Sequence, residues 1–158
     1  MAVSVFLDTS VLLAGLVDFG PQSAPAQSVM HAIAEKQVPG AGTAWHCCLE
    51  FYSVATRLPV EFRLAPADAA RLVTEEIFGR MTVYELPSGD RLMLMKSAVL
   101  DGVTGGRIYD AHIAEIARAA GAAVVVTDNR RHFIAALRYG MRVETPGEFT
   151  STFKPRRT

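Results

Sequence analysis

Residues 107–129 read RIYDAHIAEIARAAGAAVVVTDN and contain the two neighbouring elements that decide the fold. Up to Ala120 the apolar residues recur at helical spacing, which predicts an amphipathic helix over 107–120. The run that follows, Ala122 to Val126, is short and apolar at every position, as in a parallel strand that is buried on both faces of its sheet. Residues 2–7, AVSVFL, repeat this strand pattern near the beginning of the chain, apart from Ser4. The sequence therefore predicts at least two central strands of a parallel sheet.

The rest of the chain alternates in the same way between helical and extended patterns, and Gly or Pro residues end several of the segments. In the helix expected over residues 88–100, Leu92, Met95 and Val99 are expected to face the core. Strands separated by helices predict an α/β fold with a central, mainly parallel sheet and helices on both faces. We expect the remaining helices over residues 11–17, 24–36, 45–58, 66–79 and 130–137, and the remaining strands over 81–86 and 141–143.

Length and composition limit the class of protein. A chain of 158 residues with 50% hydrophobic residues and a mean hydropathy of +0.21 has the size of one domain and enough apolar material for one core. The chain has no apolar run near the roughly 20 residues that span a bilayer, so we expect a soluble, cytoplasmic protein without a membrane partner. Cys47 and Cys48 are adjacent, where a disulfide would be strained, and we expect them to be buried thiols.

Four acidic residues stand where a parallel α/β protein brings side chains together. Asp8 follows the first strand, Asp128 follows the strand at 122–126, and Glu50 and Asp110 lie early in helical segments. Ligands of open α/β sheets bind at the carboxyl ends of the strands, so these acids can converge at one edge. Two carboxylates about 4 Å apart repel by roughly 4 kcal/mol at an effective dielectric constant near 20, so such a cluster needs a divalent cation. Oxygen ligands suit Mg²⁺ or Mn²⁺, and a carboxylate-held metal with open positions can cleave phosphodiesters.

Each acid also has a structural interpretation, which the residues alone leave open. Asp8 could cap the helix that follows it. Glu50 could pair with Arg57, two helical turns along the same face. Asp110 could interact with the dipole of its helix, and Asp128 could belong to a turn. The joint pattern favours a shared site over four separate structural roles.

Three stretches of the chain carry a resemblance to a known family: SVFLDTSVLLA, CCLEFYSVATR and RIYDAHIAEIARAAGAAVVVTDNRRHF. Together they resemble the PIN-domain ribonucleases and, more narrowly, the VapC-type toxins of bacterial toxin–antitoxin pairs. The resemblance extends over the whole chain in the right order. It implies a single PIN-like nuclease domain over residues 1–150, followed by a basic C-terminal tail over 151–158.

The resemblance implies which residues form the site. Asp8, Glu50 and Asp110 match the family's metal-binding acids, and Ser10 stands in the place of the small hydroxyl or amide that follows the first acid. By this resemblance, Asp8 and Asp110 are the principal ligands of Mg²⁺ or Mn²⁺. Glu50 orients or deprotonates the attacking water, and Asp128 supports a second ion or the surroundings of the first.

The fourth acidic position departs from the family pattern. The family most often places its last acid two residues after the strand-ending Thr127, where this chain has Asn129, whereas Asp128 comes one residue earlier. Either side chain could fill the position. Arg130 and Arg131 follow and could bind RNA phosphates, since residues 128–158 carry seven Lys or Arg against three Asp or Glu. Both arginines could equally be ordinary surface residues.

The implied function is a Mg²⁺- or Mn²⁺-dependent endoribonuclease that acts as the toxin of a toxin–antitoxin module. Its partners would be RNA, a small cognate antitoxin and a second copy in a homodimer. Val29, Ile33, Phe51 and Leu58 are candidates for the apolar surface that meets a protein partner, unless they belong to the core. The alternative is a catalytically inactive PIN-like scaffold that binds RNA or protein. A receiver domain or a haloacid-dehalogenase-like phosphatase fits less well, because the chain has neither an acidic pair close after its first strand nor an Asp-x-Asp there.

Overall fold

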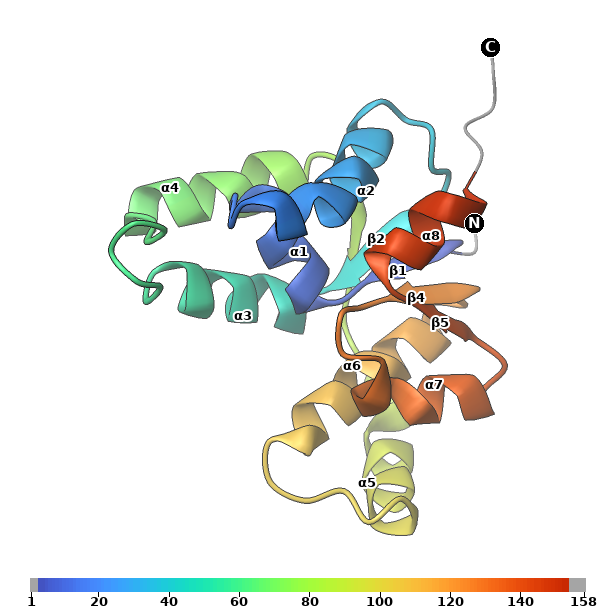
Figure 1. Ribbon diagram of the computed structural model, residues 1–158. Helices are drawn as coiled ribbons and strands as arrows, with labels where there is room; N and C mark the ends of the chain where they lie inside the picture. The colour runs from blue at the N-terminus through green and yellow to red at the C-terminus, as the bar shows by residue number, and fades with distance from the viewer. Residues whose placement is uncertain (1–2, 154–158) are drawn as a thin grey trace.

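A computed structural model describes residues 3–153 of the chain (Figure 1). Its centre is a five-stranded sheet in the order β3-β2-β1-β4-β5. All four strand pairings are parallel, so the predicted α/β class with a parallel sheet is confirmed. The strands are β1 (Val5–Leu7), β2 (Ala41–Ala44), β3 (Thr82–Tyr84), β4 (Val124–Val126) and β5 (Arg142–Glu144).

Helices cover both faces of the sheet, as predicted. In the view of Figure 1, α5, α6 and α7 lie below the sheet, and α1 and α2 lie above it. Within residues 3–153, no helix is both long and apolar enough to cross a bilayer. The helices are α1 (Thr9–Leu16), η1 (Pro21–Ser23), α2 (Ala24–Ala34), α3 (Trp45–Ala55), α4 (Pro66–Arg71), which continues as the π-helical η2 (Leu72–Ile77), η3 (Ser88–Asp90), α5 (Arg91–Leu100), α6 (Arg107–Ala119), η4 (Arg130–Phe133), α7 (Ile134–Arg138) and α8 (Pro146–Thr152).

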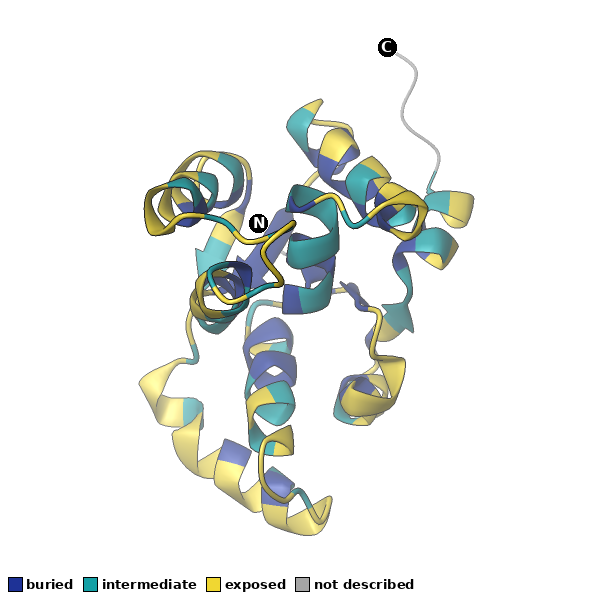
Figure 2. Ribbon diagram, turned by 60° about the vertical axis from the view of Figure 1, so that its left-hand side comes forward, coloured by how far each residue is buried: buried dark blue, intermediate teal, exposed yellow. Residues whose placement is uncertain are grey.

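The core lies between the sheet and the inner faces of the helices, which Figure 2 shows in dark blue. The residues of β1 and β4 are almost inaccessible to solvent, as their apolar sequences predict. Cys47 and Cys48 are buried free thiols, as predicted. Burial raises the pKa of Cys47 to about 12 and that of Cys48 to about 11, so neither is a ready thiolate at neutral pH.

Two elements were not predicted from the sequence. The strand β2, AGTA, contains small residues with little intrinsic preference for a strand, and its burial between β1 and β3 outweighs that preference. A Cβ at Gly42 would lie only 2.9 Å from Tyr84 Cε2, so a side chain there would force the tyrosine ring to move. The second element, α8, begins with Pro146 and is capped by Thr145, which accepts a hydrogen bond from the Glu148 amide at 3.2 Å.

The C-terminal boundary remains a prediction. The helix α8 ends at Thr152, two residues beyond the predicted limit at 150. Residues 154–158, which make up most of the predicted tail, lie outside the described part of the chain.

The structure overturns one prediction about apolar residues and decides a second question that the sequence left open. In α5, Leu92, Met95 and Val99 are 75%, 50% and 81% exposed, and Leu94 and Ala98 face inward instead. Only this narrow face of α5 meets α6, so most of the helix is exposed.

Val29, Ile33 and Phe51 are at most 3% exposed and belong to the core, and Leu58 packs against that core. Three of the four residues therefore have no surface to offer a protein partner.

A buried carboxylate ties together the helices below the sheet. Glu115 on α6 is 2% exposed and accepts hydrogen bonds from Arg118 Nε at 2.8 Å and from the Tyr139 hydroxyl. The Tyr139 hydroxyl also lies 3.1 Å from the Ser97 hydroxyl on α5. These bonds satisfy a charge that burial would otherwise make costly, and they link α5 and the end of α7 to α6.

Candidate active site

The predicted site residues lie at or near the carboxyl edge of the sheet. Asp8 follows β1 directly, Glu50 is on α3 after β2, and Asp128 comes two residues after β4. Asp110 is in the first turn of α6, which packs against β2. The four acids therefore come from four separate segments, as the topology of a parallel sheet predicts.

Asp8 is held by two hydroxyl groups. Its Oδ2 atom accepts hydrogen bonds from Ser10 Oγ at 3.0 Å and from Thr127 Oγ1 at 2.8 Å. Asp8 occupies the N-cap position of α1, but its side chain makes no capping hydrogen bond. Burial raises the pKa of Asp8, the two hydroxyls lower it, and the nearby Asp110 raises it further. The side chain thus faces the site, and the interpretation of Asp8 as a helix cap is wrong.

Ser10 and Thr127 join the ends of β1 and β4. Besides binding Asp8, Ser10 Oγ accepts the Asp128 amide at 3.1 Å, and Thr127 Oγ1 accepts the Asn129 amide at 3.0 Å. The predicted supporting residue Ser10 therefore contacts both the first acid and the loop after β4. Thr127 was not predicted as a site residue. The signal that could have found it is a hydroxyl at the end of a buried apolar strand, next to the position of the fourth acid.

Glu50 lies against an imidazole. His46 Nε2 is 2.6 Å from Glu50 Oε1, one helical turn earlier on α3. His46 Nδ1 is in turn 3.0 Å from His112 Nδ1 on α6. The partner of Glu50 is thus a histidine of its own helix, and the suggested ion pair with Arg57 is not formed among residues 3–153. Oε1 is inaccessible to solvent, and its contact with His46 Nε2 lacks the alignment of a hydrogen bond, so a metal would have to compete with the imidazole for this oxygen.

Asp110 couples electrostatically to the other acids. Burial raises its pKa, His132 lowers it, and Glu50 raises it. Its Oδ2 atom is 3.1 Å from His132 Nδ1, at the start of the basic segment that follows the fourth acid. Since Asp110 also raises the pKa of Asp8, the structure brings these three acids within electrostatic range of one another.

The fourth acid lies in an adjoining polar pocket. Asp128 is more exposed than Asp8. The partial burial of its carboxyl group raises its pKa. The pocket has a volume of about 510 Å³. Arg130, a candidate for RNA binding, pairs with Glu148 at 2.9 Å. The residues that line the pocket are Arg107, Asp128, Asn129, Arg130, Arg131, His132 and Thr145.

Arg107 is a further basic residue that the sequence did not single out. It lies in the first turn of α6, three residues before Asp110, and its charge lowers the pKa of that carboxyl. With Arg131 it lines the pocket beside the acids. The structure thus places two arginines at the rim of an acidic cluster, which is the charge pattern that a phosphodiester requires.

The donor atoms of the cluster suit a divalent metal. Carboxylate oxygens are the preferred protein ligands of Mg²⁺ and Mn²⁺, and Asp8, Glu50 and Asp110 supply such oxygens. Among residues 3–153, however, no three His, Cys, Asp or Glu side chains already surround a single point in ligating geometry. Glu50 and Asp110 rest against imidazoles instead. The residues therefore fit a metal chemically, and binding one would draw these carboxylates away from their histidines.

Comparison with known proteins places the chain in a family. A family model described as PIN domain matches residues 4–131. The chain belongs to the PIN domain family. Over 85 residues, this PIN domain is 40% identical to Ribonuclease VapC27 of Mycobacterium tuberculosis (strain ATCC 25618 / H37Rv). That stretch is 54% of this chain and 60% of the relative, so the chain spans about three fifths of the relative's length.

Solved structures share the fold at low sequence identity. DNA-bound VapBC from Salmonella typhimurium matches with a TM-score of 0.63 and 20% identity, over 91% of this chain and 98% of that chain. FitAcB from Neisseria gonorrhoeae matches with a TM-score of 0.61 and 16% identity, over 90% of this chain and 97% of that chain. These matches show that the chain shares its fold with those two proteins.

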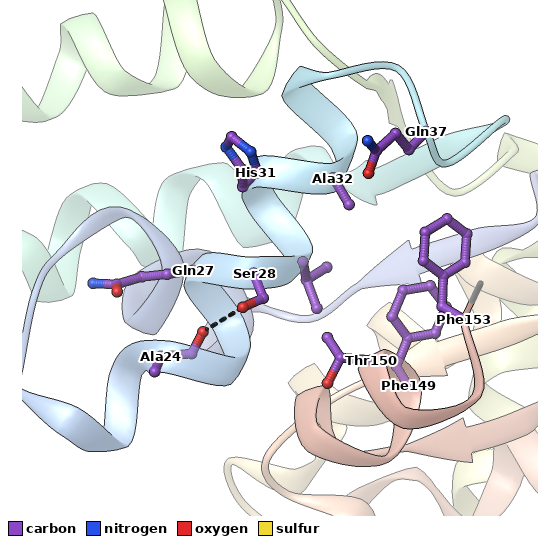
Figure 3. Close-up of a pocket in the computed structure, with 10 residues that line it drawn as sticks. Ala24, Gln27, Ser28, His31, Ala32, Gln37, Phe149, Thr150 and Phe153 are labelled. Carbon is purple, nitrogen blue, oxygen red and sulfur yellow. Dashed lines mark hydrogen bonds between the residues drawn. The ribbon is translucent and has the colours of Figure 1, made fainter. Parts of the chain in front are cut away.

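A second hollow lies away from the acids, between α2 and α8 (Figure 3). Its volume is about 510 Å³, and Phe149 and Phe153 point into it from α8 and the residue after it. Gln27, Ser28 and His31 line the α2 side. The Ser28 hydroxyl is used within its own helix, where it donates to the Ala24 carbonyl oxygen at 3.0 Å. The lining of this hollow, within the described residues, includes no Asp or Glu, so the acidic cluster remains the candidate active site.

Proposed function

We propose that this PIN domain is a Mg²⁺- or Mn²⁺-dependent endoribonuclease and the toxin of a toxin–antitoxin module. The observation that carries the proposal is the electrostatic coupling of Asp8, Glu50 and Asp110, which three separate elements bring to one place. Asp8 is buried and Glu50 and Asp110 are partly exposed, and neighbouring carboxylates repel one another unless a cation compensates them. The similarity to Ribonuclease VapC27 supports RNA as the substrate.

Each residue has a defined part in the proposed reaction. Asp8, Asp110 and Glu50 would bind the metal ion, which supplies positive charge to the scissile phosphate and lowers the pKa of a bound water. Ser10 and Thr127 keep the Asp8 carboxylate in place through their hydroxyls. Glu50 accepts the proton of the attacking water, whose oxygen bonds to phosphorus as the bond from phosphorus to a ribose oxygen breaks.

Basic and polar residues around the cluster would complete the site. Arg107 and Arg131 line the pocket next to the acids and would bind the phosphates that flank the scissile one. Asp128 or Asn129, in the same pocket, would support a second ion or the surroundings of the first.

The proposed partner is a small antitoxin that covers the acidic cluster in the cytoplasm. VapBC and FitAcB, the toxin–antitoxin proteins with the same fold, support such a partner. An Arg or Lys of the antitoxin would neutralise the carboxylates in place of the metal. We also propose a homodimer. Leu92, Val99 and Leu100 of α5 are 75%, 81% and 82% exposed, and they offer the surface that the buried Val29 does not.

An inactive scaffold that binds RNA or protein is the second candidate. The observation in its favour is that Glu50 and Asp110 contact histidines and that the described residues contain no ready-made ligand set. Cleavage that depends on a metal separates the two candidates.

The test is cleavage of single-stranded RNA by the purified protein with Mg²⁺ or Mn²⁺, repeated with excess EDTA. We expect cleavage with either metal and none with EDTA. Loss of a residue that only orients a metal ligand typically lowers activity about 10- to 100-fold. Asp110→Asn removes a ligand itself and should lower the cleavage rate by more than that. Asp68→Asn removes a carboxylate that pairs with Arg71 on α4 and should cleave at the wild-type rate. Wild-type turnover by folded Asp110→Asn would reject the assignment.

A further inference from the structure

A third cavity lies beside the acidic cluster. It lies between α3, α5 and α6 and has a volume of about 580 Å³, within the range of small-molecule sites. Trp45 and Leu49 line it from α3, Met95 from α5, and Tyr109 from α6. Trp45 is 37% exposed and Tyr109 is 57% exposed, so both aromatic rings are accessible from solvent.

Two histidines lie between the cavity and the acids. His46 and His112, which contact each other through their Nδ1 atoms at 3.0 Å, both line its wall. His46 also reaches Glu50, and Tyr109 immediately precedes Asp110 in the chain. A group bound in the cavity would therefore lie next to a phosphate bound at the acids.

The lining suits a flat, uncharged ring better than a charged group. Glu85 and Arg91 contribute one charge of each sign, and the imidazoles offer further hydrogen-bonding atoms for the edge of a base. The ring of Tyr109 packs against His46 with a centroid distance of 5.4 Å, and Trp45 packs against Phe78 at 5.8 Å. Both rings are thus supported by neighbours while part of their surface remains open.

We propose that this cavity binds one nucleobase of single-stranded RNA beside the cleaved phosphodiester, with the base stacked on Tyr109 and Trp45. The proposal rests on the proposed function, since it takes RNA as the substrate. Single-stranded RNA is commonly recognised by stacking of its bases on aromatic side chains. This cavity provides the accessible aromatic surface, and its position makes the bound base a determinant of where cleavage occurs.

Trp45 is the only tryptophan of the chain, so its fluorescence reports on the cavity directly. The experiment titrates the full-length protein in EDTA with oligoribonucleotide octamers of A, C, G or U and with an abasic octamer of the same charge. We expect at least one of the four base-containing octamers to quench the fluorescence and the abasic octamer to leave it unchanged. Tyr109→Ala should weaken binding of that octamer about 5- to 150-fold, as expected for loss of one base stack of roughly 1–3 kcal/mol.

Tyr52→Ala is the matched control. Tyr52 is also an exposed tyrosine, 39% accessible on α3, but it does not line the cavity, and its substitution should leave binding unchanged. The proposal is overturned if the abasic octamer quenches equally, if Tyr52→Ala weakens binding as much as Tyr109→Ala, or if no octamer quenches. Self-association that shifts the Trp45 emission and blocks quenching would overturn it in favour of a second copy as the occupant.

Because the readout is binding in EDTA, the test separates the two proposals. Quenching that depends on Tyr109 supports the base site even if the protein proves to be an inactive scaffold. Metal-dependent cleavage without quenching leaves the nuclease proposal standing and removes the base site alone.

Discussion

Replacing Asp8 separates its structural contribution from its catalytic one. Ser10 Oγ and Thr127 Oγ1 both donate to the same oxygen, Oδ2, at 3.0 and 2.8 Å. In Asp8→Asn the amide oxygen can occupy that position and accept both hydrogen bonds, while the negative charge is lost. In Asp8→Ala both hydroxyls lose their acceptor. The two variants should therefore be equally inactive but differ in stability.

The expected magnitudes follow from these contacts. Thr127 is fully buried, and an unsatisfied buried donor costs about 1–3 kcal/mol, so Asp8→Ala should lower the free energy of unfolding by about that amount. In EDTA, the free energy of unfolding of Asp8→Asn should be at least as high as that of the wild type. Burial raises the pKa of Asp8, so the folded state loses stability as the pH rises from the unfolded-state pKa through the higher folded-state pKa, and the full cost is present above the latter. Any gain in Asp8→Asn should thus appear at neutral pH and disappear under strongly acidic conditions, where Asp8 is protonated in both states.

Urea unfolding in EDTA measures the stabilities, and melting with added Mn²⁺ measures metal binding. Mn²⁺ should raise the melting temperature of the wild type and not that of Asp8→Asn. RNA cleavage by each purified variant completes the comparison. An Asp8→Ala protein as stable as the wild type would refute the argument from the two hydrogen bonds. Wild-type cleavage by Asp8→Asn would refute the catalytic assignment.

Asp128→Ala is expected to weaken metal affinity in cleavage assays by about 10- to 100-fold, with partial rescue by excess Mn²⁺; full activity in Asp128→Ala together with loss in Asn129→Ala would give the fourth position to Asn129. Gly15→Ala should lower the unfolding free energy by about 1–3 kcal/mol in urea titrations, because its Cβ would lie 3.1 Å from the Ala26 carbonyl oxygen on α2. Gly147→Ala on α8, whose Cβ would meet nothing within 4 Å, is the control and should be neutral or stabilising by about 0.5–1 kcal/mol. Expression of the wild-type chain alone should arrest bacterial growth, and the neighbouring small gene product should restore it; harmless expression of soluble, metal-loaded protein would reject the toxin proposal.

The central strands were predictable because their apolar composition indicates that they are buried. β1 and β4 are continuous apolar runs, and only a parallel sheet covered on both faces buries such runs completely. β2 gave no such signal, because AGTA becomes a strand only through pairing with β1 and β3. The prediction of which face of α5 points inward was wrong for a related reason. Helical spacing identifies an apolar face, but the extent of the neighbouring helix decides which residues it buries.

The same distinction applies to the candidate site. The sheet-edge rule placed Asp8, Glu50 and Asp110 together, since it depends only on topology. The neighbours of these acids depend on side-chain contacts across long sequence separations, such as the separation of 119 positions from Asp8 to Thr127. His46 could have been found from its spacing of four residues before Glu50 on one helix. The contact of His132 with Asp110 joins η4 to α6, and the sequence offered no spacing rule for it.

The register of the central strands is what brings the acids together. In β1, Leu7 lies opposite Thr43 of β2 and Val126 of β4, so the three strands end at nearly the same level. Thr43 Oγ1 donates to the Leu7 carbonyl oxygen at 2.7 Å and fastens β2 to β1 one residue before Asp8. A shift of β2 by one residue would reverse its buried faces and move α3, with Glu50, relative to Asp8. The proposed chemistry therefore depends on the pairing of the central strands as well as on the acids themselves.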